Sequence, residues 1–293
     1  MKKLLVLTDF TSNSAHAATI AVGICNRLGT DLLLYHSIQY VPLVTDYTYG
    51  TYITGTANTL FKESREKLTQ EAESLQPMAL RNNVYHPIIR CESGEGNLGA
   101  NVKKITKKMD IIMVVMGGRS GGALDHLLTG SETTAVIKNA MKPVLVIPEK
   151  ADLNSINRVI FATDFGTADI AALKYLTEIA TPLGFEIEVV HVERPHTTST
   201  GIEREVTFRE YLNELGSEKI SYGSIIGKHA VPRLQDYCKE TSSVILAMTH
   251  GSQGFISRLF DHSETKEVIA HQQVAVIIFP PAFTDHITYN GRL

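Results

Sequence analysis

The chain has 293 residues, of which 43% are hydrophobic and 20% are charged, and its formal net charge at pH 7 is -3. This composition is ordinary for a globular protein with a proper core, and the small negative charge gives no reason to expect nucleic acid or an anionic membrane as a partner. At roughly 150 residues per domain, the length predicts two domains.

The chain repeats itself at the length of a domain. A strand-like apolar run that ends at Asp9 returns with its end at Asp164, 155 residues later. The triplet Ser131-Glu132-Thr133 returns as Ser263-Glu264-Thr265, 132 residues later, so the second copy is 23 residues shorter. Repeats of this length are whole domains and not the units of a solenoid or a propeller.

The first copy predicts five strands with helices between them. Continuous apolar runs are typical of parallel strands that are buried on both faces. Helices are predicted by apolar residues three and four apart, by capping side chains at their start and by a glycine such as Gly29 at their end. The strands are expected at 4–10, 32–36, 85–89, 111–116 and 144–147, and the helices before Gly29, at 58–80, at 97–108 and from Ser131.

The second copy predicts the same order of elements. Asp169 is expected to cap its first helix, which ends before Gly184, and the region 194–221 is shorter than its counterpart in the first copy. The strands are expected at 158–165, 187–191, 223–226, 244–248 and 274–278, and the later helices at 231–239 and from Ser263. Each copy is therefore an α/β domain with a doubly wound, five-stranded parallel sheet.

These patterns divide the chain into domains at 1–149 and 156–281, with a linker that begins at Glu149 and a polar tail at 282–293. The stretch from Tyr40 to Tyr52 is rich in tyrosine and lies within the insertion of the first copy. It is either a loop over a site or a plain connection, since long loops divide between these two cases.

A glycine-rich segment follows the fourth strand of the first copy. Gly117, Ser120, Gly130 and Ser131 fall on the spacing G-x2-G-x9-G-[ST], with Ser120 in place of the second glycine. Here the chain resembles the universal stress protein family, whose ATP-binding members carry that pattern at this position. The resemblance covers essentially the whole chain, twice, through the Thr-Asp strand end, the histidine that ends the second strand, and the last strand that closes on a proline.

The resemblance implies a stress-response protein of the tandem type, with an adenine nucleotide α-hydrolase-like fold and a pseudo-twofold arrangement of its copies. It implies that the first copy binds ATP or another adenine nucleotide, with or without Mg²⁺. Asp9 and the loop after His36 would contact the nucleoside end. The implied binding residues are Thr8, Asp9, Ile38, Met116, Gly117, Arg119, Ser120, Gly130, Ser131 and Glu132.

Physical chemistry supports a ligand at the same place. In a doubly wound sheet, ligands bind off the carboxyl ends of the strands where the winding reverses, which here lies between Asp9 and Gly117. Gly117 permits the close approach of a ligand. Gly130 and Ser131 open a helix whose free N–H groups attract phosphate, and Arg119 offers a charged donor.

Each of these residues has an interpretation without a ligand. Ser131 could be a helix N-cap, with Glu132 complementing the helix dipole, and Glu132 also places a carboxylate near any phosphate. Asp9 and Asp164 could be turn residues at strand ends. The histidines that end the second strands, His36 and His191, are more often satisfied polar groups than ligands.

The second copy has lost the glycine pattern. Thr249 and His262 stand where the first copy has Gly117 and Gly130, and both side chains block the geometry that glycine allows. The second copy is therefore not expected to bind ATP in the manner of the family, although a shift by one residue, using Thr249-His250-Gly251, leaves that alternative open. No spacing of its histidines marks a metal site.

The chain shows no catalytic machinery. It has no nucleophile beside a base, no paired carboxylates at a strand end and no Walker A lysine, so it is not expected to be an enzyme beyond weak ATP hydrolysis. Three hypotheses stay open: a nucleotide-binding stress protein, an interaction module that binds no nucleotide, and a slow ATP hydrolase.

Partners and location follow from cysteines and strand edges. The three cysteines form no C-x-x-C pair, which is typical of reduced thiols. No apolar run nears the roughly 20 residues of a membrane span, and the first apolar run meets Asp9 too soon for a secretory signal. We therefore expect a cytoplasmic protein. The runs from Val144 to Ile147 and from Val274 to Ile278 are apolar edges that should not stay bare. We expect the two copies to pair through them, or else to exchange partners in a homodimer.

Overall fold

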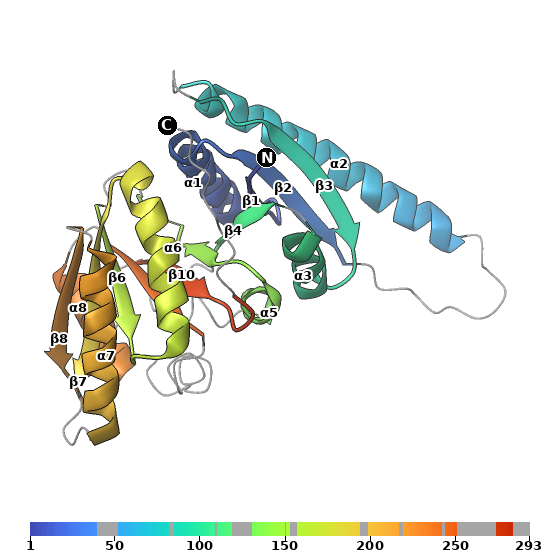
Figure 1. Cartoon of the computed structure of the whole chain (residues 1–293). Coiled ribbons are helices and arrows are strands. Elements are labelled where there is room, and N and C mark those ends of the chain that lie inside the picture. The colour runs from blue at the N-terminus through green and yellow to red at the C-terminus, as the bar shows by residue number, and fades with distance from the viewer. Residues whose placement is uncertain are drawn as a thin grey trace.

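A computed structural model of the chain describes residues 1–39, 52–81, 85–108, 110–118, 131–149, 151–152, 157–193, 199–216, 219–241, 244–250 and 274–283. These residues form one ten-stranded sheet in the order β3-β2-β1-β4-β5-β10-β9-β6-β7-β8 (Figure 1). The first half has β1 Lys3–Leu7, β2 Asp31–Ile38, β3 Ile89–Glu95, β4 Ile111–Gly117 and β5 Val144–Ile147. The second half has β6 Arg158–Thr163, β7 Glu186–Glu193, β8 Ile220–Ile226, β9 Val244–Thr249 and β10 Ala275–Phe279.

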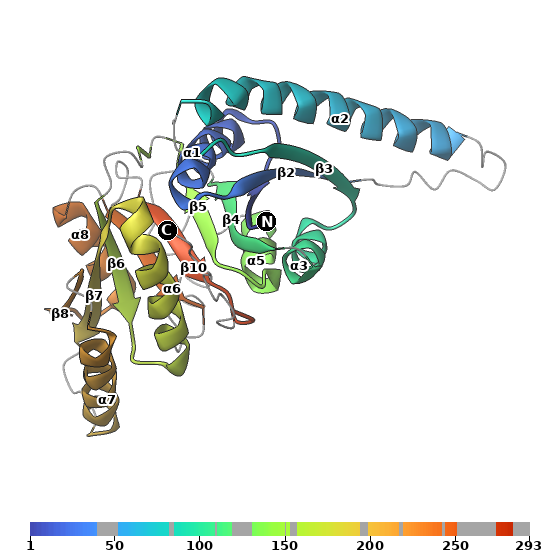
Figure 2. The same cartoon turned by 45° about the horizontal axis from the view of Figure 1, so that its top comes forward.

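Helices cover both faces of the sheet, which confirms the α/β fold. In the first half, α1 Ser12–Leu28 and α2 Tyr52–Ala79 lie on one face, and α3 Leu98–Lys108 and α5 Ser131–Asn139 lie on the other (Figure 2). The second half has α6 Thr167–Leu183, α7 Ser199–Leu215 and α8 Ala230–Glu240. Successive residues of a strand point to opposite faces, so Leu4 packs in the core layer of α1 and α6, and Leu5 in the layer of α3, α5 and α8.

The two halves join through their last strands. All neighbouring strands run parallel except β5 and β10, which pair antiparallel with Val276 opposite Val146 and Ile278 opposite Val144. These are the strands through which the sequence led us to expect pairing. Both core layers contain residues of both halves, so the hydrophobic core continues across this seam.

The helix boundaries follow the expected signals with one correction. Helix α1 is capped by Thr11 and ends at Gly29, whose φ of 63° is left-handed. We expected Asp169 to cap α6, but Gly166 is the N-cap and Asp169 lies one turn into the helix. The Asp169 carboxylate is buried in the first turn and accepts the N–H of Gly166 at 3.2 Å, so it supports the helix start from the N3 position of a capping box and is not the N-cap.

The third strand of the first half is also displaced from its expected position. The sequence predicted 85–89, but β3 spans Ile89–Glu95. Pro87 has no N–H to donate to a ladder, and the Tyr85 hydroxyl and the Ile88 N–H both donate to the Asp31 carboxylate, at 2.8 and 3.1 Å. The prediction followed the apolar residues at 85–89. An edge strand need not be apolar, so the polar residues that form most of β3 were not recognised as a strand.

The insertion of the first copy is largely helical where it is described. Helix α2 has 28 residues, whereas α7 in the same place of the second half has 17. Tyr52 begins α2, and the rest of the tyrosine-rich stretch lies outside the described residues, as does the helix expected from Ser263.

Candidate functional site

The candidate site lies at the carboxyl ends of β1, β2 and β4. The order of the strands reverses between β1 and β4, which are neighbours in the sheet, so a crevice opens off their ends. Seven of the ten expected residues are described there or close by: Thr8, Asp9, Ile38, Met116, Gly117, Ser131 and Glu132. Arg119, Ser120 and Gly130 lie outside the described residues.

Asp9 presents an exposed carboxylate directly after β1. Its Oδ1 accepts the N–H of Thr11 at 3.1 Å and the hydroxyl of Thr11 at 2.6 Å. Partial burial raises the pKa of Asp9. The hydrogen bonds that its carboxylate accepts, those from Thr11 first among them, together lower the pKa by more, so the pKa lies below its ordinary value. Asp9 is therefore an anion at neutral pH, and its side chain is exposed.

Glu71 reaches the same strand end from α2, and sequence reasoning missed it. Thr8 donates its hydroxyl to Glu71 Oε2 at 2.8 Å and lies 3.1 Å from the hydroxyl of Ser14. Burial raises the pKa of Glu71, the Thr8 hydroxyl opposes that shift, and the charge of Asp9 adds to it. Nothing local in the sequence marks Glu71, because it is 63 residues from Thr8 and the contact depends on how α2 packs.

A contact between a phenylalanine and a histidine ring lies at the end of the first strand in both halves. Phe10 and Phe165 have φ angles of 64° and 62°, which bulky side chains rarely adopt. The ring of His36 lies 4.4 Å from that of Phe10, and its Nδ1 is 2.8 Å from the Thr8 carbonyl oxygen. His191 repeats both contacts at 4.3 and 2.9 Å. These histidines are therefore satisfied structural groups, as the interpretation without a ligand predicted.

Gly117 is required by the protein's own backbone. A Cβ at this position would lie 2.8 Å from the carbonyl carbon and oxygen of Asn13 and 3.0 Å from the nitrogen of Ser14. The Asn13 side chain also donates to the carbonyl oxygen of Gly118 at 2.9 Å. The close approach that we expected of a ligand is thus made by the start of α1, which closes one side of the crevice.

Ser131 and Glu132 form the opposite side of the crevice. Both are exposed at the start of α5, and the start of a helix carries the positive end of its dipole. Glu132 accepts a hydrogen bond from the Gln39 side chain at 2.7 Å. Since Gln39 follows β2 directly, this contact links the end of β2 to the start of α5.

The second half fills the matching position with a polar network. Thr249 ends β9 where the first half has Gly117, and Asp169 stands where the first half has Ser14. The Asp169 carboxylate accepts the hydroxyls of Thr249 and Thr163 at 2.6 and 2.7 Å. Burial raises the pKa of Asp169, and the two hydroxyls oppose that shift. The network therefore ties β6, β9 and α6 together at the position where the first half only brings a glycine against a helix.

A pocket of about 590 Å³ lies beyond this network, between the start of α6 and α7. Among the described residues, its charged lining residues are Asp164, Glu203 and Arg204, so in that part of the lining acidic groups outnumber basic ones. That balance does not suit a phosphate, in spite of the helix N-terminus nearby.

No described helix combines the length and the apolar character needed to cross a bilayer. Within the described ranges, no three or more His, Cys, Asp and Glu side chains gather as a metal site would require.

Comparison with known proteins places this geometry in context. The model of the universal stress protein family matches residues 1–148. A universal stress protein of Methanocaldococcus jannaschii is 28% identical over 147 residues, which are 50% of this chain and 81% of that protein. One of Mycolicibacterium smegmatis is 24% identical over 270 residues, 87% of this chain and 90% of that protein. The crystal structure of a universal stress protein from Archaeoglobus fulgidus aligns with this structure at a TM-score of 0.65 and 19% identity. The alignment covers 95% of this chain and 96% of the Archaeoglobus chain.

Proposed function

The chain belongs to the universal stress protein family, in a tandem arrangement, and we propose that its first half binds ATP or another adenine nucleotide. The observation that carries this proposal is the reversal of strand order between β1 and β4, where doubly wound sheets place their ligands, together with the exposed carboxylate of Asp9 and the exposed start of α5 at Ser131. The glycine-rich segment that joins β4 to α5 has the spacing of the family's ATP-binding members.

The proposed roles follow from the chemistry of each end. The exposed carboxylate of Asp9 accepts hydrogen bonds from hydroxyl or amino groups of the nucleoside, and Ile38 and Met116 stand near the carboxyl ends of the neighbouring strands β2 and β4. The N–H groups at Ser131 and the guanidinium of Arg119 serve the phosphates. Gly130 and Ser120 complete the segment by their place in the motif, and Mg²⁺ would accompany the phosphates.

We propose one nucleotide per chain. The Asp169–Thr249 network occupies the matching position of the second half, and the pocket beyond it carries an excess of acidic groups. Any hydrolysis is slow and incidental. Among the described residues of the candidate site, the hydroxyls of Thr8 and Thr11 lie beside a carboxylate, but each already donates to it, Thr8 to Glu71 and Thr11 to Asp9.

A second candidate function has its own support. Glu132 places a carboxylate at the phosphate end, and its hydrogen bond to Gln39 crosses the crevice. A nucleotide would have to displace that contact. An interaction module that binds no nucleotide would keep it.

The cytoplasm is the compartment we propose for this protein. Cys25, Cys91 and Cys238 are all free thiols, and Cys25 and Cys238 are buried. Free thiols are typical of a reducing compartment.

The test is a calorimetric titration with Mg-ATP of the wild type, Asp9→Ala and Asp164→Ala. The two aspartates hold the same place in the repeat, so Asp164→Ala is the matched control. We expect one site per chain, an affinity at least about tenfold weaker for Asp9→Ala because a charge-assisted hydrogen bond is lost, and no change for Asp164→Ala.

Each other outcome assigns a different function. Two sites per chain would mean that the second half binds as well. Binding that survives Gly130→Val would overturn the assignment of the phosphate end, and no heat at any concentration would leave the interaction module. Steady release of ADP that Gly130→Val abolishes would favour the slow hydrolase.

A further inference from the structure

Strand β8 is an unprotected edge of the sheet. It lies at the outer side of the second half (Figure 1), and within the described residues it pairs with β7 alone. Exposed edges are normally protected by charged residues or proline, and β8, from Ile220 to Ile226, contains neither. The opposite edge, β3, carries Arg90, Glu92 and Glu95.

The backbone of β8 shows which groups face outward. Ile187 N–H donates to the Lys219 carbonyl and Gly227 N–H donates to the Glu193 carbonyl, so the odd-numbered residues of β8 turn their polar groups toward β7. The N–H and C=O of one strand residue point to the same side. Ile220, Tyr222, Ser224 and Ile226 therefore turn theirs outward.

This pattern is complementary to itself. When two copies of β8 run antiparallel about a two-fold axis at Gly223, Tyr222 lies opposite Ser224 and Ile220 lies opposite Ile226. Each of these is a hydrogen-bonded pair, because both of its residues face outward. Gly223 then meets its own copy at the close spacing of a non-hydrogen-bonded pair, where it has no side chain to clash, and the space around it is open.

The other edge fails the same arrangement. The middle residue of β3 is Glu92, so a two-fold axis there would place two copies of Glu92 directly opposite each other. Like charges in that position destabilise strand pairing. With the two-fold axis at the middle residue, β8 can therefore pair with its own copy, whereas β3 brings like charges together.

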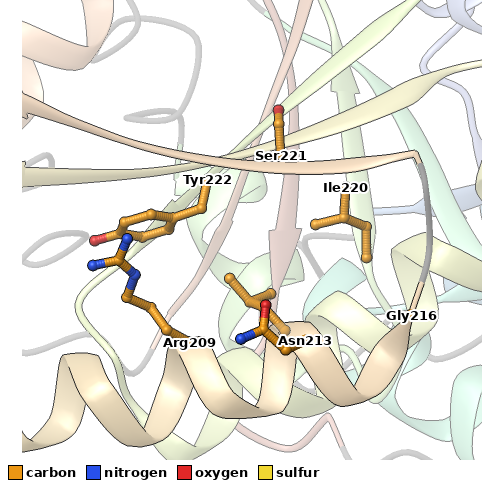
Figure 3. A pocket seen from close by; sticks show the side chains of 7 residues that line it. Arg209, Asn213, Gly216, Ile220, Ser221 and Tyr222 are labelled. Atoms are coloured by element: carbon orange, nitrogen blue, oxygen red, sulfur yellow. The ribbon is translucent and has the colours of Figure 1, made fainter.

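Exposed apolar side chains gather beside β8. Figure 3 shows a groove of about 480 Å³ between α7 and β8, with Ile220 pointing toward the helix. Ile202, Val206 and Ile226 are 55%, 51% and 77% exposed. Ile202 and Val206 share one face of α7 with Arg209 and Asn213, which line the groove, since these positions are three and four residues apart.

We propose that two copies of this chain associate through β8 about a two-fold axis at Gly223, which extends the sheet from one molecule into the next. Ile226 of each copy then covers Ile220 of the other at the mouth of the groove. The exposed face of α7 lies beside the same face of the second copy. We choose a second copy as the partner for three reasons. The outward hydrogen-bonding groups of β8 are complementary to those of another β8, the strand carries no charge that would repel its copy, and its exposed apolar side chains can cover each other.

Light scattering after size exclusion measures the association directly. The wild type should have a mass of about twice 32.3 kDa, falling toward one chain on dilution. Ser224→Pro removes an outward N–H and leaves the ladder with β7 intact. It should weaken the dimer by at least about tenfold, because two symmetry-related hydrogen bonds are lost. Ile226→Lys should do the same by placing a charge in the contact.

The matched control is Ser93→Pro in β3. Leu32 N–H donates to the Ile88 carbonyl and Gly96 N–H to the Ile38 carbonyl, so Ser93 also faces outward, but on the edge that we expect to stay free. Ser93→Pro should dimerise like the wild type. Circular dichroism of all variants shows whether they are folded. A wild type that stays at 32.3 kDa at every concentration, or a folded Ser224→Pro that dimerises normally, would overturn the proposal.

A disulfide tests the register. A non-hydrogen-bonded pair has Cα atoms about 4.5 Å apart, which a disulfide spans, so Gly223→Cys should cross-link two chains under mild oxidation. Ser221→Cys is the control, because Ser221 would lie opposite Ile225 and not opposite itself. Equal cross-linking by both variants would contradict this two-fold pairing. So would a chain that stays monomeric and binds a peptide of another protein along β8.

Discussion

Two carboxylates distinguish the halves of this protein at the scale of single residues. In the first half, Glu71 reaches Thr8 from a distant helix, and in the second, Asp169 reaches the matching Thr163 from the adjacent helix. The same strand-end hydroxyl is satisfied in both, but only the second arrangement also binds Thr249 and closes the position between the strands.

Asp169 makes the stability of the protein depend on pH in a definite direction. Burial raises its pKa in the folded protein, so protonation favours the folded state. This contribution is fully present below the unfolded pKa and is lost as the pH rises through the folded pKa. As the pH rises from below the ordinary pKa of an aspartate to neutrality, we expect the free energy of unfolding of the wild type to fall relative to that of Asp169→Asn.

Urea unfolding at a series of pH values measures this difference. Thr249→Val should enlarge the loss, because it removes the hydroxyl that most opposes the raised pKa of Asp169. A difference between the wild type and Asp169→Asn that is flat or grows with pH would contradict the assigned direction.

At the scale of elements, the contact between α1 and β4 shapes the candidate site. Gly117→Ala would place a methyl group against the Asn13 backbone, so α1 would have to move. We expect this substitution to lower the free energy of unfolding by about 1–3 kcal/mol, the usual range for overpacking. Chemical denaturation measures it.

Gly23→Ala in the middle of α1 is the control for that substitution. A Cβ there meets nothing within 4 Å, so alanine should be neutral or stabilise the helix by up to about 1 kcal/mol. A harmless Gly117→Ala would mean that the glycine is present for a ligand after all.

At the scale of the whole molecule, the seam between β5 and β10 makes two repeats into one sheet. Tyr175 of α6 is fully buried and donates its hydroxyl to the Ile112 carbonyl of β4, at 3.1 Å, which ties the halves together across the seam. Arg27 of α1 donates to the Leu183 carbonyl at 3.1 Å on the surface.

We therefore expect the chain to unfold in one calorimetric transition, because both core layers continue through both halves. Tyr175→Phe should keep the single transition and lower the free energy of unfolding by about 1–3 kcal/mol, since it leaves a buried carbonyl unsatisfied. Two separate transitions in the wild type would show that the halves are energetically independent.

The two α/β halves, most of their strands and helices, and the position of the candidate site at the ends of β1 and β4 could all be predicted from the amino-acid sequence. Apolar periodicity and capping residues such as Gly29 act locally, so they can be read from neighbours in the chain. The internal repeat supported these predictions, because the order of strands and helices in one copy predicts the same order in the other.

The groups that meet at the strand ends could not be predicted from the sequence, because they depend on the packing of the helices on the sheet. Glu71 beside Thr8, α1 against Gly117 and the interior position of Asp169 all depend on how a helix sits on the sheet. The start of β3 was decided by the Asp31 carboxylate, which binds Tyr85 and Ile88 ahead of the strand. Contacts between residues far apart in the chain leave no local pattern, because packing in three dimensions and not spacing in the sequence brings them together.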